Sequence, residues 1–454
     1  MTDMAITATR PRTFFGQPPA LGFLAFTEAW ERFSYYGMTS LLVLYMSQAL
    51  FMPEHIGNIA GFAVYRAALE GVFGKMSTLA LASQTFGLYT GFVYFTPLIG
   101  GWIADRFIGR RNAVVAGAIL MSGGHIAMAF DQSFLLALFL LITGCGLLKG
   151  NISTQVGQLY AEHDAEGRTR GFSIFSMAIN VGAVAGPLTC GLLAQTYGWH
   201  VGFGVAGLLM LFALATYLAG YRYLTETARS TAAREPAQPL TMQQKRAIGA
   251  LLVVMLITIP HSISFYQNSN IGLVWINAHV DLMAGSFHMP PTWLGGALDS
   301  FISIACVPFL IALWRWQDRH GGEPGEISKI GIGAALASIA NLVLACGALL
   351  PDRVSPLFPF LYEVILGVAF IWQWPTLLAL TSRIAPQRLK STLMGAAFLT
   401  LFASNMTIGR IGALYEHMTP SAFWALNAAI AATGAVLAFA LRKPLTRIFE
   451  SENT

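Results

Sequence analysis

The sequence predicts an all-α membrane protein with twelve transmembrane helices in two six-helix bundles. Of its 454 residues, 55% are hydrophobic and only 11% are charged, whereas about a quarter of the residues of a soluble domain are charged. The apolar residues form continuous runs that suit membrane helices, not the alternating pattern of barrel strands. This composition excludes an ordinary water-soluble enzyme, and it is too hydrophobic for a disordered chain.

Interrupting the apolar runs at charges, prolines and glycine clusters defines the individual spans. A helix needs about 20 mostly apolar residues to cross the hydrocarbon core of a bilayer. The expected spans are 20–50, 79–104, 112–130, 134–160, 170–195, 199–222, 246–279, 291–315, 327–349, 357–383, 389–414 and 420–441.

The distribution of basic residues predicts the orientation of the chain. Most Lys and Arg residues lie in the N-terminal tail 1–19, in the loops after even-numbered spans, and in the C-terminal tail 442–454. Only Arg66, Lys75 and Arg353 fall on the other side. Because basic loops remain on the cytoplasmic side, we expect both termini to be cytoplasmic, in a bacterial inner membrane.

The longest polar interruption, residues 225–245, divides the spans into halves 20–224 and 246–441, and we expect it to be a cytoplasmic linker. Each half carries an Asp-Arg pair in a glycine-containing turn between its second and third spans. We interpret the turn in the first half as a loop that takes part in conformational change. Its residues are Asp105, Arg106, Gly109, Arg110 and Arg111, and the weaker counterpart in the second half contains Asp318 and Arg319.

Charged residues within the spans are the strongest candidates for a functional site, because a charge at membrane depth is costly unless it is paired or faces water. Four carboxylates and two cations leave an excess of two negative charges. A cavity that holds them must contain water, bind a cation, or keep carboxyls protonated. These residues are Glu28, Glu31, Arg32, Lys149, Asp299 and Glu363.

The first span carries the densest group of these residues. Glu28, Glu31, Arg32 and Tyr35 follow one another at i, i+3, i+4 and i+7, which places them on one helical stripe. Such a cluster can simply join helices by neutralising its own charges. Two acids around one guanidinium, however, leave one carboxyl without a full partner, and that group can exchange protons.

The motif Glu28-x-x-Glu31-Arg32-Phe33-x-Tyr35-Tyr36-Gly37 resembles the ExxERFxYYG motif of the proton-dependent oligopeptide transporters, a branch of the major facilitator superfamily. Further segments of the first half resemble the same family almost continuously. They are Tyr94-Phe95-Thr96-Pro97 through Asp105-Arg106, Gly146 to Asn151, Gly157 to Tyr160, Phe172-x-x-Phe175, and Ile179-Asn180-x-Gly182.

The resemblance implies the major facilitator fold and a site for a small peptide. In that site Arg32 and Lys149 would receive the peptide carboxylate, while Glu28 and Glu31, paired with Arg32, would take part in proton coupling. Apart from the resemblance, protonation of Asp299 is a further hypothesis for coupling, because it is a charged residue well inside a span. An ion pair for Lys149, and simple packing for the tyrosines, are the alternative interpretations. The candidate substrate-binding residues are Arg32, Tyr35, Tyr36, Tyr94, Lys149, Asn180, Gln267, Asp299 and Trp372.

The second half departs from the family pattern. Tyr266 stands where the family has an acidic residue before a glutamine, and Phe370 stands where a glutamate normally receives the peptide amino group. Asp299 or Glu363 could replace that glutamate. For Glu363 we favour a position at the rim, paired with Arg353 or solvated.

The leading hypothesis is therefore a proton-coupled symporter that imports di- or tripeptides, or peptide-like solutes, by alternating access. Alternatives are a carrier of a non-peptide solute, such as an amino-acid derivative, an organic anion or a drug-like compound, and a solute sensor.

Motifs of metalloproteases, serine hydrolases and P-loop enzymes are absent from the sequence, so we do not expect an enzyme. We expect no cofactor or metal apart from the coupling proton, and the solute and the lipid bilayer as partners, with no nucleic acid. The sequence leaves the oligomeric state and the direction of transport open.

Overall fold

The computed structural model describes residues 13–161, 164–224, 240–386 and 389–450. Nearly all of them are helical. In the first half the elements are α1 (Pro19–Tyr45), η1 (Met46–Leu50), α2 (Pro53–Ile56), α3 (Phe62–Phe73), α4 (Thr78–Ile103), η2 (Ala104–Ile108), α5 (Arg110–Ala127), η3 (Asp131–Ser133), α6 (Phe134–Gln158), α7 (Ala165–Tyr197), α8 (Trp199–Gly220) and η4 (Tyr221–Tyr223).

The second half continues with helices and one short hairpin. Its elements are α9 (Met242–Tyr266), η5 (Asn268–Gly272), α10 (Leu273–His279), β1 (Met283–Ala284), β2 (Phe287–His288), η6 (Trp293–Ala297), α11 (Leu298–Arg319), α12 (Glu326–Gly347), α13 (Leu357–Ile384), α14 (Lys390–Gly412), η8 (Ala413–His417) and α15 (Pro420–Glu450). Strands β1 and β2 pair antiparallel, with Met283 opposite His288.

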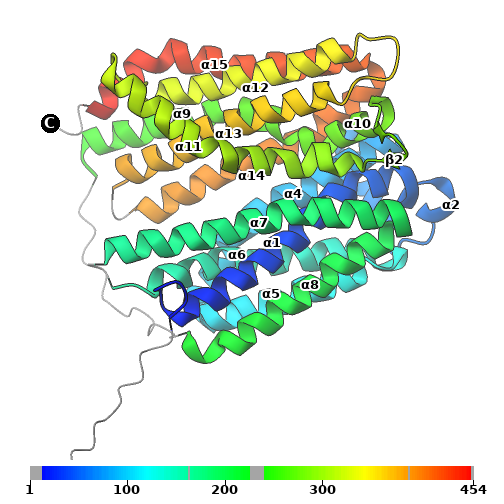
Figure 1. Cartoon of the computed structure of the whole chain (residues 1–454), viewed down its shortest axis with the longest axis horizontal. Helices are drawn as coiled ribbons and strands as arrows, with labels where there is room; N and C mark the ends of the chain where they lie inside the picture. Colours follow the sequence, from blue (N-terminus) through cyan, green and yellow to red (C-terminus); the bar gives the residue numbers. More distant parts are fainter. Residues whose placement is uncertain (1–12, 162–163, 225–239, 387–388, 451–454) are drawn as a thin grey trace, which may run out of the picture.

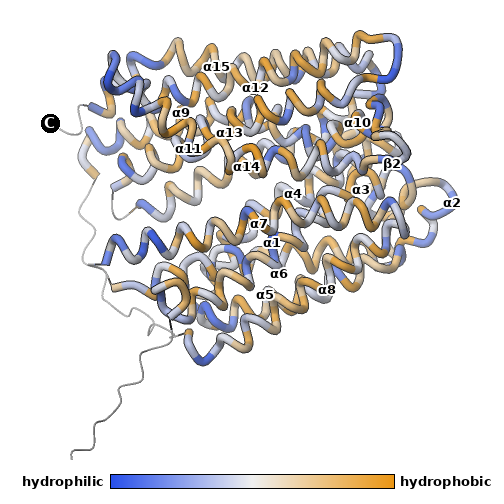
Figure 2. The backbone as a smooth tube through the Cα atoms, in the orientation of Figure 1, coloured by the Kyte–Doolittle hydropathy of each residue, from blue (hydrophilic) through white to orange (hydrophobic). Residues whose placement is uncertain are grey.

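The helices run side by side in two layers, α1 to α8 below and α9 to α15 above (Figure 1). Hydrophobic residues dominate along the helices, and hydrophilic residues gather at many of their ends (Figure 2). In the described residues, nine helices are long and apolar enough to cross a membrane. The long helices α1, α4 and α5 are not among these nine, and α1 contains three charged side chains.

The observed helices follow the expected spans closely, with local differences. The segment between the first two spans folds into α2 and α3, which we did not expect. Gly61 and Gly74, which flank α3, have φ values of 75° and 84°, a left-handed backbone that glycine adopts without strain. Expected span 246–279 is interrupted by the π-helical turn η5, and η6 contains a kink at Gly295.

Helix α15 extends to Glu450, past the expected start of the C-terminal tail at residue 442. Leu445 and Phe449 are buried and belong to the same hydrophobic cluster as α9 residues such as Leu251. Burial of one apolar face keeps this segment helical although the opposite face is polar. Most of the expected linker lies outside the described residues, and α9 already begins at Met242.

Close packing of α7 on α1 determines where the charged stripe of α1 can point. A Cβ atom at Gly182 would collide with the carbonyl oxygen of Ala29 and would lie 2.8 Å from Arg32 Cβ. Glycine therefore allows the two backbones to approach at this level, as small residues do in membrane helix pairs. The charged residues are held against α7 and away from lipid.

We expect the Gly182→Ala protein to be less stable than the wild type by about 1–3 kcal/mol, the usual cost of overpacking a well-packed core. Thermal unfolding of the purified proteins in detergent measures the difference. Gly204→Ala is the matched control, because a Cβ atom there would meet no atom within 4 Å. Equal stability of the two variants would contradict the proposed packing constraint.

Candidate functional site

The charged stripe of α1 forms a compact buried cluster. Arg32 Nε lies 3.0 Å from Glu28 Oε1 and 2.5 Å from Glu31 Oε2. The exposed fractions of the three residues are 3%, 2% and 0% in that order. In the part of the chain that the structure describes, Glu28 Oε2, Glu31 Oε1 and Arg32 Nη2 have no hydrogen-bond partner. One guanidinium thus serves two carboxylates and does not satisfy all their oxygens.

Lys149 of α6 approaches this cluster through the tyrosines. Its Nζ lies 4.7 Å from the ring centroid of Tyr94 and 5.8 Å from that of Tyr35. The guanidinium of Arg32 lies 5.5 Å from the Tyr35 ring, so this ring contacts both cations. Among the described residues Lys149 has no carboxylate within ion-pair distance. The expected alternative of an ion-paired Lys149 is not observed.

Tyrosines connect the cluster to the second half of the chain. Tyr94 Oη lies 2.9 Å from Tyr266 Oη of α9, and either hydroxyl can donate. Tyr36 packs edge-on against Tyr35, with their ring centroids 5.2 Å apart. Two cations, two carboxylates and a group of hydroxyls therefore meet where the two halves face each other. This arrangement can bind an anionic group and exchange a proton.

The remaining candidates lie in different surroundings. Asn180 of α7 and Asp299 at the start of α11 are half-buried. Gln267 is fully buried, and its Nε2 donates to the carbonyl oxygen of Ile408 at 3.0 Å, so it joins α9 to α14. Trp372 is buried and packs edge-on against Trp314 at 5.4 Å. The structure thus places Gln267 and Trp372 in helix packing contacts.

Our interpretation of Glu363 as a solvated or Arg353-paired rim residue is wrong. Its exposed fraction is 0%, and its Oε2 accepts a hydrogen bond from Asn268 Nδ2 at 3.1 Å. Its burial depends on η5 and α11, which lie elsewhere in the sequence. A buried Asn next to a buried acid has no distinctive sequence spacing.

The Asp-Arg loop between α4 and α5 is held by local contacts. Arg110 Nη2 lies 3.0 Å from Asp105 Oδ1, and Gly109 between them has φ 79°. The guanidinium of Arg111 lies 3.7 Å from the ring centroid of Tyr221 and donates to its carbonyl oxygen. The loop thus joins the ends of α4, α5 and α8, while Arg106 is exposed.

Hydrogen bonds between the halves concentrate at the end of the molecule opposite this loop. Asn270 Nδ2 donates to Ser83 Oγ at 2.7 Å, while the bond from Thr90 Oγ1 to Asn405 Oδ1, at 2.8 Å, lies midway along α4. Thr292 Oγ1 donates to the carbonyl oxygen of Pro187 at 3.0 Å. The sequence did not reveal these residues, because single Ser, Thr and Asn residues are common in membrane helices. In Figure 1 the halves meet near β2 and diverge toward the C-terminal end.

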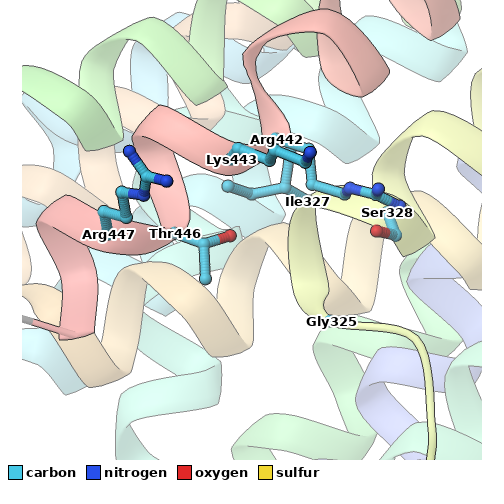
Figure 3. A pocket seen from close by; sticks show the side chains of 7 residues that line it. All are labelled: Gly325, Ile327, Ser328, Arg442, Lys443, Thr446 and Arg447. Atoms are coloured by element: carbon cyan, nitrogen blue, oxygen red, sulfur yellow. The ribbon is translucent and has the colours of Figure 1, made fainter.

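A separate hollow of about 350 Å³ lies at the ends of α12 and α15 (Figure 3). Three of its side chains are basic, and all its residues are remote in sequence from the charged stripe of α1. The lining residues are Gly325, Ile327, Ser328, Arg442, Lys443, Thr446 and Arg447. We treat it as distinct from the candidate site.

Two helical halves that meet beside a buried charged cluster are the arrangement of a multi-pass membrane transporter. A family model described as the POT family matches residues 111–238 and 223–434. The chain belongs to the POT family of the major facilitator superfamily, as the motifs predicted.

Individual relatives match along almost the whole chain. A di-/tripeptide transporter of Lactococcus lactis subsp. lactis (strain IL1403) is 29% identical over 511 residues, which cover 96% of this chain and 97% of the relative. The peptide transporter YePEPT of Yersinia enterocolitica subsp. palearctica is 27% identical and covers 97% of both chains. A variant of a peptide transporter POT, crystallised with alafosfalin, is 25% identical with a TM-score of 0.82 over 96% of this chain and 97% of that chain.

Proposed function

We propose that the protein is a proton-coupled symporter that imports di- or tripeptides, or peptide-like solutes, by alternating access. The observation that carries this proposal is that Glu28 and Glu31 share the single guanidinium of Arg32, near Lys149, which has no ion-pair partner in the described part of the chain. Protonating one carboxyl frees part of the Arg32 guanidinium, and a substrate carboxylate can then occupy it. Proton and substrate would thus bias the same equilibrium between two conformations.

The proposed site uses residues from both halves. Arg32 and Lys149 hold the substrate carboxylate, and Asp299 faces the amino group. In the family a glutamate has this second role, but Phe370 occupies its position here. The relatives named as di-/tripeptide transporters support a peptide substrate. No cofactor other than the coupling proton is needed. The proposed lining of the cavity is Tyr35, Tyr36, Tyr94 and Asn180.

We propose twelve transmembrane helices in bundles 20–224 and 246–441, a cytoplasmic linker 225–245 and cytoplasmic termini, in a bacterial inner membrane. The basic Asp105–Arg111 loop supports this orientation. The inter-half hydrogen bonds of Asn270 and Thr292 then lie at the outer end, which corresponds to a state closed to the outside. Rocking of the halves about the central site would break them.

A non-peptide organic anion is the second candidate substrate. Phe370 packs against Phe265, with ring centroids 5.2 Å apart and nearly parallel planes. The position of the usual amine-binding carboxylate is therefore apolar, which suits a solute that has a carboxylate but no amino group.

Proteoliposomes with an imposed inside-alkaline pH gradient test the proposed function. Labelled dipeptide should accumulate above its external concentration, and the gradient should collapse faster when dipeptide is added. Accumulation only of carboxylates that lack an amine would favour the second candidate. Binding without uptake under any gradient would contradict transport and favour a solute sensor.

A further inference from the structure

A second buried carboxyl site lies in the C-terminal half, around Glu363 of α13. Asn268 donates to Oε2 of this glutamate at 3.1 Å. The other oxygen, Oε1, is buried and has no hydrogen-bond partner in the described residues, and Asn268 Oδ1 is also buried and unpartnered. A single amide donor is thus available to a carboxyl group that water does not reach.

The neighbouring helix brings a second acid toward the same place. Gly367 follows Glu363 by one turn of α13, and a Cβ atom there would lie 3.1 Å from the carbonyl oxygen of Asp299. Ser303 Oγ, one turn after Asp299, donates to the carbonyl oxygen of Gly367 at 3.3 Å. The turn of α11 that carries Asp299 therefore packs against α13 one turn from Glu363.

The groups around Glu363 come from α11, η5 and α13 itself. Of the elements packed against α13, α11 contributes the carboxyl group of Asp299. Element η5 contributes the neutral amide of Asn268. Tyr362 directly precedes Glu363 in α13. Within the described ranges no Lys, Arg or His forms an ion pair with Glu363 or Asp299. Both acids therefore lack the kind of partner that Arg32 gives to Glu28.

An ionised carboxylate in this position would be buried without a counterion, which is strongly unfavourable. The neutral acid suits the same contacts. Its carbonyl oxygen can be Oε2, which accepts from Asn268, and its O–H bond can form at the unpartnered Oε1. A negative charge on Asp299 further favours this neutral form, because like charges repel.

We propose that Glu363 binds one exchangeable proton at Oε1, with Asn268 as the positioning residue, in a proton site separate from Glu28, Glu31 and Arg32. On release, the O–H bond of Glu363 breaks and the half-buried Asp299 is the neighbouring carboxylate that takes the proton. The coupling of this proton to transport rests on the proposed function, whereas the binding of the proton to Glu363 does not.

Infrared difference spectroscopy of the purified protein tests the proton directly. We expect the wild type to show a protonated-carboxyl band at neutral pH, and this band should disappear on alkaline titration. The Glu363→Gln protein should lack the band. Glu54→Gln is the control, because Glu54 is exposed and its loss should leave the band unchanged. A band that persists undiminished in Glu363→Gln would overturn the proposal.

A second variant keeps the test decisive if Glu363→Gln does not fold. Asn268→Leu removes the donor to Oε2, so the neutral form should be favoured more strongly and the band should titrate at higher pH with a shifted frequency. An unchanged frequency and titration would overturn the proposal. Because the band is measured without substrate, its presence supports the proton site even if no dipeptide is transported.

Discussion

Proteoliposomes containing the Glu31→Gln protein are expected to lose proton-driven accumulation of dipeptide while retaining exchange of labelled for unlabelled substrate. Among the residues that the structure describes, the substitution leaves Glu28 as the only carboxylate within ion-pair distance of Arg32, so the variant no longer has two acids competing for one guanidinium. One pH unit corresponds to about 1.4 kcal/mol, which allows about tenfold accumulation per coupled proton. The variant should instead equilibrate to equal concentrations inside and outside.

Comparing Glu31→Gln with the wild type requires separate measurements of gradient-driven accumulation and of counterflow, which is the exchange of labelled for unlabelled substrate. Glu54→Gln is the matched control, since it removes an exposed carboxylate outside the cluster and should accumulate substrate like the wild type. If Glu31→Gln accumulates dipeptide at the wild-type ratio, the coupling role of the cluster is refuted. If counterflow is also lost, the residue serves substrate binding or folding and does not specifically serve coupling.

Lys149→Gln is expected to weaken binding of dipeptides with a free carboxylate by about 10-fold to 100-fold. Hydrogen bonds to charged groups contribute about 1.5–3 kcal/mol, and each 1.4 kcal/mol corresponds to a factor of ten. The half-buried ammonium lies beside Tyr94 and Tyr35 with no carboxylate partner among the described residues. It is therefore available to an anionic substrate.

Binding of a dipeptide and of its C-terminal amide, measured by thermal shift, separates this role from a general loss of structure. The amide lacks the anionic group, so its affinity should change much less in Lys149→Gln. Lys75→Gln provides the control, because Lys75 is exposed in the segment between α3 and α4. Equal losses for the acid and the amide would show that Lys149 does not recognise the carboxylate.

The charged cluster on α1 was predictable because its residues belong to one helix. The spacing of Glu28, Glu31, Arg32 and Tyr35 places them on one stripe whatever the rest of the fold does. Lys149 was predictable as an intramembrane charge, but its position between two tyrosine rings depends on how α6 packs against α1 and α4. The missing ion pair of Lys149 is therefore a tertiary result.

Glu363 and Gln267 show where sequence reasoning failed or stopped. Arg353 was the nearest cation in sequence to Glu363, so a rim pair was the simplest interpretation. The fold instead packs Asn268 against this carboxyl, and it directs the Gln267 amide to the backbone of α14. Partners that come from separate helices leave no periodic pattern in a single sequence.

The amino-acid sequence by itself determined that the chain is a helical membrane protein, where most of its long helices lie along the chain, and which face of α1 is charged. These properties depend on hydrophobicity and on the 3.6-residue period, both of which act locally. Tertiary structure alone decided which charges remain unpaired, which polar residues join the halves, and where the second acidic site lies. Such contacts form between segments far apart in the chain, where burial removes water and makes each missing partner costly.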